Sequence, residues 1–132
     1  MLKNAALFIV MLMAHFGYAQ DFAGHYTWKS EDGTDKFTLD LKKTSDTTFE
    51  GCHYASVFNG ECKDASFNKK DITVKGKVKG DTLVIQIEGR YTVGAKAKVY
   101  LTPTDKKGMY LWRVATLAKG MYHYPDYAML KK

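Results

Sequence analysis

The sequence lacks a recognisable catalytic motif. It contains no nucleophile elbow, no phosphate-binding glycine loop and no cysteine–histidine dyad, and its adjacent acids Glu31 and Asp32 fall in a predicted turn. Beyond the N-terminal segment, His25, His53 and His123 each stand alone, without the spacing of a metal-binding motif. These absences predict a protein that is not an enzyme and that carries no metal and no cofactor.

Long apolar runs are also scarce. The run Ala5–Ala14 follows Lys3 and precedes small residues at Gly17 and Ala19, which is typical of a secretory signal peptide cut after Ala19. The run is too short to cross a bilayer, since a spanning helix needs about 20 apolar residues. A buried N-terminal helix is the alternative interpretation. We expect residues 1–19 to be removed, leaving a secreted or periplasmic protein without an integral membrane segment.

The expected mature chain, residues 20–132, has the length of a single domain. It shows no linker, repeat or low-complexity tract, and the whole sequence is 45% hydrophobic and 14% aromatic, which is enough to build one core. Removal of the leader takes away one lysine and no acid, so 19 basic and 14 acidic residues remain, with a net charge of +5. This basic balance fits an acidic partner better than a basic one.

Residues 72–89 alternate between apolar and polar side chains, which is the pattern of antiparallel strands. A two-residue turn at Gly80-Asp81 places Val78 opposite Leu83 and Val74 opposite Ile87, so that apolar side chains meet on every rung. Small residues at Gly76, Gly89, Ala95 and Ala97 share this inward face and predict strong local curvature or the close approach of a bulky group.

The loop lengths of the neighbouring hairpins are predicted in the same way, by requiring that apolar side chains face each other across the strands. A three-residue loop, Thr92-Val93-Gly94, would pair Tyr91 with Ala95 and Ile85 with Leu101. A second three-residue loop, Thr44-Ser45-Asp46, would place Leu41 near Phe49 and bring His53 toward Phe37.

These segments add up to about eight strands and no helix, which predicts an all-β fold, an antiparallel up-and-down barrel, with a two-sheet β-sandwich as the alternative. The opening FAGHYTW resembles the first strand of lipocalin-like barrels, although Tyr26 stands where that family has tryptophan. More broadly, the leader, the GxYxW motif, the NG loop and the late W-x-V strand are similar to small uncharacterised exported bacterial proteins. The resemblance implies a fold and a compartment but no activity.

The stretch GCHYASVFNGEC holds both cysteines, Cys52 and Cys62. In an exported protein two cysteines pair readily, so we expect a disulfide that rigidifies this loop. A redox pair is the alternative, but the spacing is not C-x-x-C. A zinc site would need four ligands, and His53 brings the number available here to three. If Asn59-Gly60 forms a two-residue turn, Cys62 lies opposite Val57 and Cys52 lies on the other face of its strand.

Aromatic residues cluster at this loop and near the C-terminus. We predict that a ligand or partner contacts six residues, which are Tyr54, Phe58, Asn59, Tyr122, Tyr124 and Tyr127. Phe58 is either an anchor for a partner or a plug that folds over the end of the barrel. The tyrosines stack on a sugar ring, line the entry of an apolar ligand, or simply cover one end.

One face of the central strands is basic. Adjacent strands would bring together Lys75, Lys77, Lys79, Lys96 and Lys98. Such a patch attracts phosphate, an acidic polysaccharide or an acidic protein, whereas the alternative is that these lysines only keep the strands soluble and unpaired at their edges. Nucleic acid is not an expected partner.

Two functions remain open. In the first, the open end of the barrel holds a small apolar or sugar-like ligand. In the second, a secreted or periplasmic inhibitor or immunity protein binds a protein target through the Cys52 to Cys62 loop. An interior with room for roughly 300 Å³ favours the ligand carrier, whereas an interior filled by Trp28, Trp112 and Phe37 leaves only the outer surface. The oligomeric state does not follow from the sequence.

Overall fold

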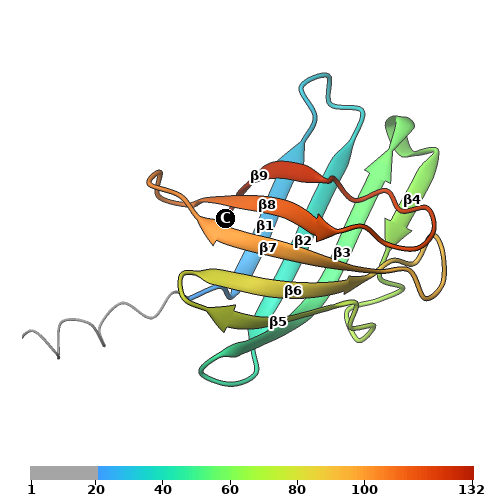
Figure 1. Cartoon of the computed structure of the whole chain (residues 1–132). Helices are drawn as coiled ribbons and strands as arrows, with labels where there is room; N and C mark the ends of the chain where they lie inside the picture. The colour runs from blue at the N-terminus through green and yellow to red at the C-terminus, as the bar shows by residue number, and fades with distance from the viewer. Residues whose placement is uncertain (1–20) are drawn as a thin grey trace, which may run out of the picture.

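Alternating side chains form nine antiparallel strands in the computed structural model, which describes residues 21–132 (Figure 1). The signal peptide predicted at residues 1–19 lies outside the described residues. The strands are β1 (Gly24–Lys29), β2 (Lys36–Lys43), β3 (Thr48–Val57), β4 (Cys62–Ala65), β5 (Val74–Lys79), β6 (Thr82–Glu88), β7 (Lys96–Pro103), β8 (Met109–Thr116) and β9 (Tyr127–Lys131). A single 3-10 turn, η1 (Phe58–Gly60), connects β3 to β4.

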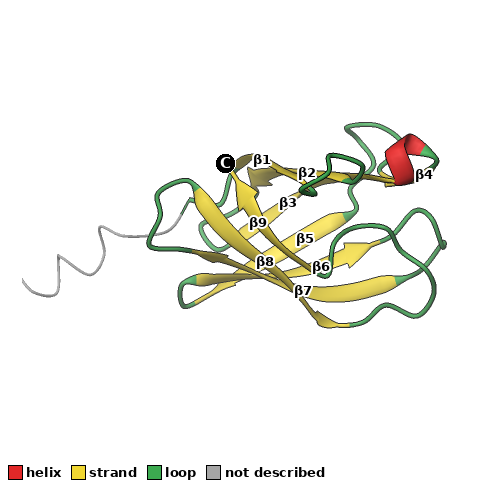
Figure 2. Ribbon diagram, turned by 90° about the horizontal axis from the view of Figure 1, so that it is seen from above, coloured by secondary structure: helices red, strands yellow, loops and turns green. Residues whose placement is uncertain are grey.

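Eight of these strands close into a barrel, which confirms the predicted fold and excludes the sandwich. The hydrogen-bonded ring runs β1, β2, β3, β5, β6, β7, β8 and β9, and β9 returns to β1 through the pair Thr27 and Lys131. Strand β4 is an extra strand that pairs with the second half of β3. In Figure 1 the strands from β5 to β9 cross in front of β1, β2 and β3, and Figure 2 shows the same closure from above.

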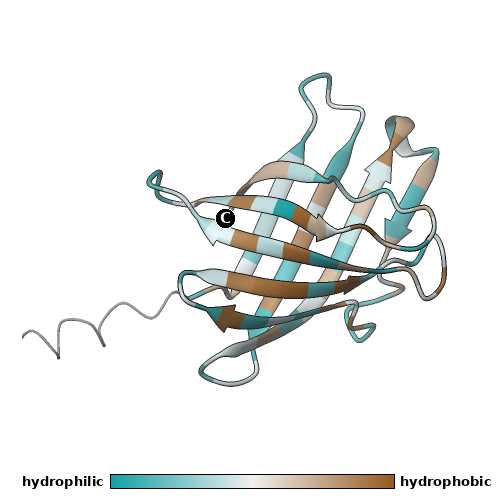
Figure 3. Ribbon diagram, in the orientation of Figure 1, coloured by the Kyte–Doolittle hydropathy of each residue, from teal (hydrophilic) through white to brown (hydrophobic). Residues whose placement is uncertain are grey.

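Aromatic side chains fill the barrel. Trp112, Tyr26, Phe22 and Phe37 have no surface that water can reach, and the rings of Phe37 and Trp112 lie 4.8 Å apart. Aliphatic side chains complete the core, and Trp28 packs against it while half-buried. The hydropathy colours alternate along the strands accordingly (Figure 3). The inner volume next to these side chains is therefore occupied by the protein itself.

The predicted register is confirmed for the β5–β6 hairpin and wrong by two residues for the next one. Val78 lies opposite Leu83 and Val74 opposite Ile87, as expected. In β6 and β7, however, Ile85 pairs with Val99 rather than with Leu101. The connection takes up five residues, 90–94, because the N–H of Gly89 already donates to the carbonyl of Ala95. A shift of two leaves every side chain on its predicted face.

The β2–β3 register is likewise shifted by two. Leu41 pairs with Gly51 rather than lying near Phe49, and His53 pairs with Leu39 rather than facing Phe37. At Gly51 the two strands approach so closely that a Cβ atom would lie 1.6 Å from the carbonyl oxygen of Asp40. Only glycine fits there.

The predicted disulfide is wrong, because both cysteines are free. Cys52 pairs with Asp40 on the outside of the barrel, whereas Cys62 pairs with Val57. Cys52 and Val57 are five positions apart on β3, which corresponds to about 17 Å along the strand. A disulfide requires Cα atoms within about 7 Å of each other. The Cys52 thiol instead points at the carbonyl groups of residues 68, 69 and 71, at 3.4 to 3.8 Å.

No helix in residues 21–132 has the length and apolar character that a membrane-spanning helix needs.

Candidate functional site

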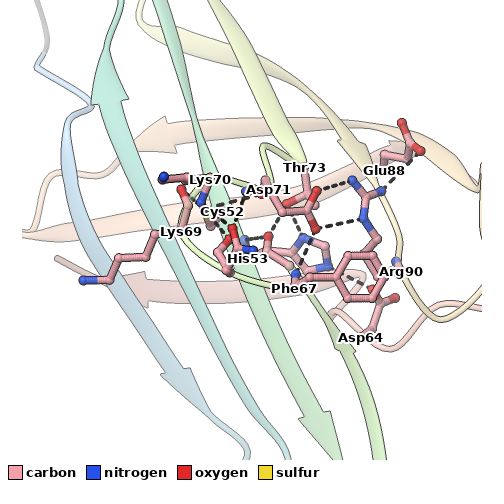
Figure 4. A network of polar contacts seen from close by, with 12 residues as sticks. Cys52, His53, Asp64, Phe67, Lys69, Lys70, Asp71, Thr73, Glu88 and Arg90 are labelled. Carbon is pink, nitrogen blue, oxygen red and sulfur yellow. Dashed lines mark hydrogen bonds and ion pairs between the residues drawn. The ribbon is translucent and has the colours of Figure 1, made fainter.

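A buried polar network stands near one end of the barrel (Figure 4). His53 of β3 lies between Thr73, whose hydroxyl is 2.6 Å from Nδ1, and Asp64 of β4, whose carboxylate is 2.9 Å from Nε2. Asp64 also accepts the backbone N–H groups of Arg90 and His123, at 2.8 and 3.1 Å. Burial alone would raise the pKa of Asp64, but the hydrogen bonds from His53, Arg90 and His123 together lower it.

A second ion-pair group adjoins this network. The Arg90 guanidinium donates two hydrogen bonds to Asp71, at 2.7 and 3.0 Å, and lies 3.2 Å from Glu88. The hydrogen bond from Arg90 lowers the pKa of Asp71. The same carboxylate accepts the N–H of Phe67, whose ring lies 5.8 Å from the guanidinium. Arg90 therefore fixes the loop at residues 66–73.

Thr73, His53 and Asp64 have the hydroxyl, imidazole and carboxylate order of a hydrolase triad. The Asp64 and His53 side chains are fully buried, however, and Thr73 is 3% exposed, so a substrate does not reach the hydroxyl. We assign this arrangement to holding the loops, not to chemistry. Within residues 21–132 no cluster of three or more potential metal ligands occurs.

The network positions an exposed apolar surface that we call the loop end. It is formed by η1, the loop at residues 66–73 and the β6–β7 and β8–β9 connections, which lie beside β4 on the right of Figure 1. His123 joins these segments, since its ring lies 4.2 Å from that of Tyr91 and 6.4 Å from that of Phe58. Six large apolar side chains are exposed on the loop end, namely Phe58, Phe67, Tyr91, Val93, Leu117 and Met121.

Phe58 has an unusual backbone. Its φ is +53° and that of Asn59 is +59°, in the left-handed region that disfavours side chains with a Cβ atom. The Phe58 N–H donates to the Asp35 carboxylate at 3.2 Å, and the Asn59 N–H donates to the Thr34 carbonyl at 3.0 Å. The turn between β1 and β2 thus holds an aromatic side chain in solvent, 62% exposed, at the expense of backbone strain.

The six predicted contact residues do not form one site. Phe58 lies on the loop end, whereas Asn59 and Tyr54 line an adjacent hollow of about 250 Å³ on the outside of β3. Tyr124 is buried against Trp112 and serves as a cover of the core. Tyr122 stacks on Tyr124 with ring centres 4.4 Å apart, and Tyr127 lies opposite Arg113 on the outside of β8 and β9.

Tyr122 and Asp126 form a close hydrogen bond beside this stack. Burial and that carboxylate raise the pKa of Tyr122 to about 12, so its hydroxyl stays protonated and donates. Two buried polar atoms nearby, the Tyr124 hydroxyl and Nε2 of His123, have no hydrogen-bond partner among residues 21–132.

The five predicted lysines share the outside of β5 and β7, and the structure adds residues that the sequence analysis missed. Arg113 of β8 lies directly opposite Tyr100 of β7. We call this outer surface the basic face, with the cations Lys75, Lys77, Lys79, Lys96, Lys98 and Arg113. Arg113 alternates with the buried Trp112 and so lies on the outer side of β8, and the β7–β8 register brings it to the lysines.

Two hollows mark the basic face. One, of about 560 Å³, lies over β5, β6 and β7, and the other, of about 420 Å³, lies over β6, β7 and β8. They share Val84 and Lys98. No acidic residue lines either hollow.

Comparison with known proteins found no family model, no curated protein and no solved structure that matches this chain. The predicted resemblance to lipocalin-like exported proteins therefore stays a prediction.

Proposed function

We propose that this protein is an exported, non-enzymatic binding protein whose loop end docks into an apolar cleft of a protein partner. Phe58 carries the proposal. Strained backbone at an exposed aromatic residue persists only where the surrounding structure holds it in place, and such strain is concentrated at ligand-contacting segments. An aromatic side chain that is already fixed loses little conformational freedom on binding and suits the centre of an interface.

The rest of the loop end supports the same function. Exposed apolar side chains that gather on one surface are typical of protein interaction sites. The buried bonds of Asp64 to His53, Arg90 and His123 keep the loops in place before a partner arrives. This is the inhibitor-type function among the two that the sequence left open, although the rigid element is a hydrogen-bonded loop and not a disulfide.

The other function requires a small apolar or sugar-like ligand inside the open end. The buried aromatic side chains around Trp112 and Tyr26 occupy that volume, so this function has less support. Native mass spectrometry of the protein isolated from its source distinguishes the two, since a carrier retains a small molecule of constant mass.

Site-specific photocrosslinking tests the proposal. Benzoylphenylalanine at position 58 is expected to form a crosslink with one protein species in an extract of the source cells and their medium. The matched control carries the same group at Tyr127, which is 63% exposed but lies outside the loop end. An excess of unlabelled protein should suppress the product, and an excess of the Phe58→Gly variant should not. Equal products from both positions, or none from position 58, would refute the proposal.

A further inference from the structure

We infer that the basic face is a second binding site, separate from the loop end, and that it takes an acidic polysaccharide. Three observations carry this inference: within residues 21–132 the cations on this face have no counter-ion, an aromatic ring holds two of them together, and the surface under them is hollowed.

The cations of the basic face form no ion pair among the described residues, although the register places two acids beside them. Glu50 lies opposite Lys75 and Glu88 lies opposite Lys96, where each acid would neutralise its neighbour. Both acids instead contact other cations, since Glu50 is 3.8 Å from Lys42 and Glu88 is 3.2 Å from Arg90. Among residues 21–132, the ion pairs involve none of the six cations of the basic face. Their charge is available to an external anion.

Two of these cations lie near the aromatic ring of Tyr100. The Lys98 ammonium lies 5.8 Å from the centre of its ring and the Arg113 guanidinium lies 5.1 Å from it. Cation–π attraction holds each side chain near the ring, although two like charges repel each other at this range. A carboxylate or sulfate between them relieves that repulsion, and Arg113 binds such a group with two parallel hydrogen bonds.

The layout of the face matches a polymer better than a single anion. Successive lysines on β5 are two residues apart, which is about 7 Å along the strand, and the two hollows join at Val84 and Lys98. A free phosphate would contact only part of this surface. A linear chain with one charge per sugar unit reaches cations in both hollows, and avidity adds the contacts together.

The other groups on the face favour sugar over protein. The lining between the cations includes the amide of Gln86 and the hydroxyl groups of Thr82, Thr102 and Thr116, which suit the hydroxyl groups of a polysaccharide. A protein interface has a well-packed apolar centre. Here the apolar side chains of the lining offer little surface to a partner, since Ile85 and Ala97 are buried and Val84 and Leu111 are half-buried.

The test is binding to polygalacturonate by isothermal titration calorimetry at about 0.15 M salt, where long-range attraction is screened. Neutral dextran is the ligand control. The variant is Lys98→Glu with Arg113→Glu, which reverses the two charges at Tyr100. The protein control is Lys106→Glu with Lys107→Glu, which makes the same change in net charge on two exposed lysines of the β7–β8 turn. Circular dichroism checks that both variants are folded.

We expect the wild type to bind polygalacturonate and not dextran, the variant at Tyr100 to bind at least about tenfold more weakly, and the turn variant to stay within about twofold. An equal loss in both variants would show that net charge alone is responsible and would overturn the inference. Absence of polygalacturonate binding would also overturn it, and so would a preference for phosphatidylglycerol vesicles over the polysaccharide. Because the crosslinking test probes position 58, either proposal can fail without the other.

Discussion

At the scale of single residues, the carboxylate of Asp64 connects strand β3 to two connections of the loop end. It accepts the Nε2–H of His53 from β3, the N–H of Arg90 from the β6–β7 connection and the N–H of His123 from the β8–β9 connection. Replacing this buried acceptor by a hydrogen-bond donor is costly. An N–H that loses its acceptor has given up its hydration without compensation.

We therefore predict that Asp64→Asn, which keeps the size of the side chain, lowers the free energy of unfolding by about 2 to 4 kcal/mol. The amide nitrogen of asparagine would face N–H donors in a fully buried site. Urea denaturation followed by tryptophan fluorescence measures the change. The control is Asp105→Asn in the exposed β7–β8 turn, where we expect a change within about 0.5 kcal/mol. Equal effects would contradict this role of Asp64.

Phe58 allows a second prediction at this scale. Glycine adopts a positive φ freely, so Phe58→Gly should leave the free energy of unfolding unchanged within about 1 kcal/mol although it removes a large side chain. Phe58→Val should lower it by about 1 kcal/mol or more, because a β-branched residue is strained at this φ. Chemical denaturation of both variants checks the order. A valine variant as stable as the glycine variant would show that the backbone at Phe58 is not strained.

Motif spacing does not reveal the polar network, because Thr73 and Asp64 reach His53 from positions 20 and 11 residues away. The period-two pattern does place His53 on the inward face with Phe49 and Ala55. A buried histidine needs polar partners, so the pattern indicates that partners exist without identifying them.

At the scale of elements, β3 is divided between two partners. Its first half, from Thr48 to Gly51, pairs with β5, and its second half, from Tyr54 to Val57, pairs with β4. Between the halves the loop at residues 66–73 attaches to β3, since Ser66 donates to the carbonyl of His53 and Thr73 to that of Gly51. The interval between the two pairings contains His53, the residue of β3 that belongs to the polar network.

We predict that Gly51→Ala destabilises the protein more than Gly76→Ala. At Gly51 a Cβ atom meets the carbonyl of Asp40, which is backbone, so β2 and β3 would have to separate. At Gly76 the nearest atoms, at 2.8 Å, belong to the side chain of Leu83, which can move. We expect about 3 kcal/mol or more for the first change and about 1 to 2 kcal/mol for the second, measured as denaturation midpoints. The reverse order would contradict the proposed strand contact.

Local patterning predicted the strands, their faces and the tight β5–β6 hairpin, because a two-residue turn fixes its own register. It failed where a distant contact sets the length of the connection. The predicted loop Thr92-Val93-Gly94 left Arg90 and Tyr91 in the strand, but the N–H of Arg90 is bound to Asp64 and its guanidinium to Asp71, which draws residues 90–94 into the loop. The disulfide failed because export predicts that cysteines pair, whereas β3 holds these two cysteines about 17 Å apart.

At the scale of the whole molecule, one filled barrel carries two surfaces of opposite character. The loop end exposes apolar side chains and is held by the carboxylates of Asp64 and Asp71. The basic face is charged and lies on the outside of strands whose inner side chains build the core. A change on one surface should leave the other intact, since the rigid barrel lies between them.

Acid should weaken the whole fold through the loop end. Asp64 and Asp71 both have a pKa below the ordinary value of 3.8 in the folded protein, so the unfolded chain takes up protons first as the pH falls. The free energy of unfolding is therefore at its full value above about pH 5 and decreases as the pH drops through 3.8 toward the folded pKa values. Urea midpoints between pH 7 and pH 3 measure this decrease.

The variant Asp64→Asn isolates the contribution of one group. It lacks the carboxyl group that titrates, so its midpoint should depend less on pH than that of the wild type, and the gap between the two proteins should narrow toward pH 3. Asp105→Asn, whose carboxylate is exposed in a turn, should follow the wild type throughout. If the curves of Asp64→Asn and the wild type ran parallel, protonation of Asp64 would not be linked to unfolding, and the loop end would be held by its other contacts.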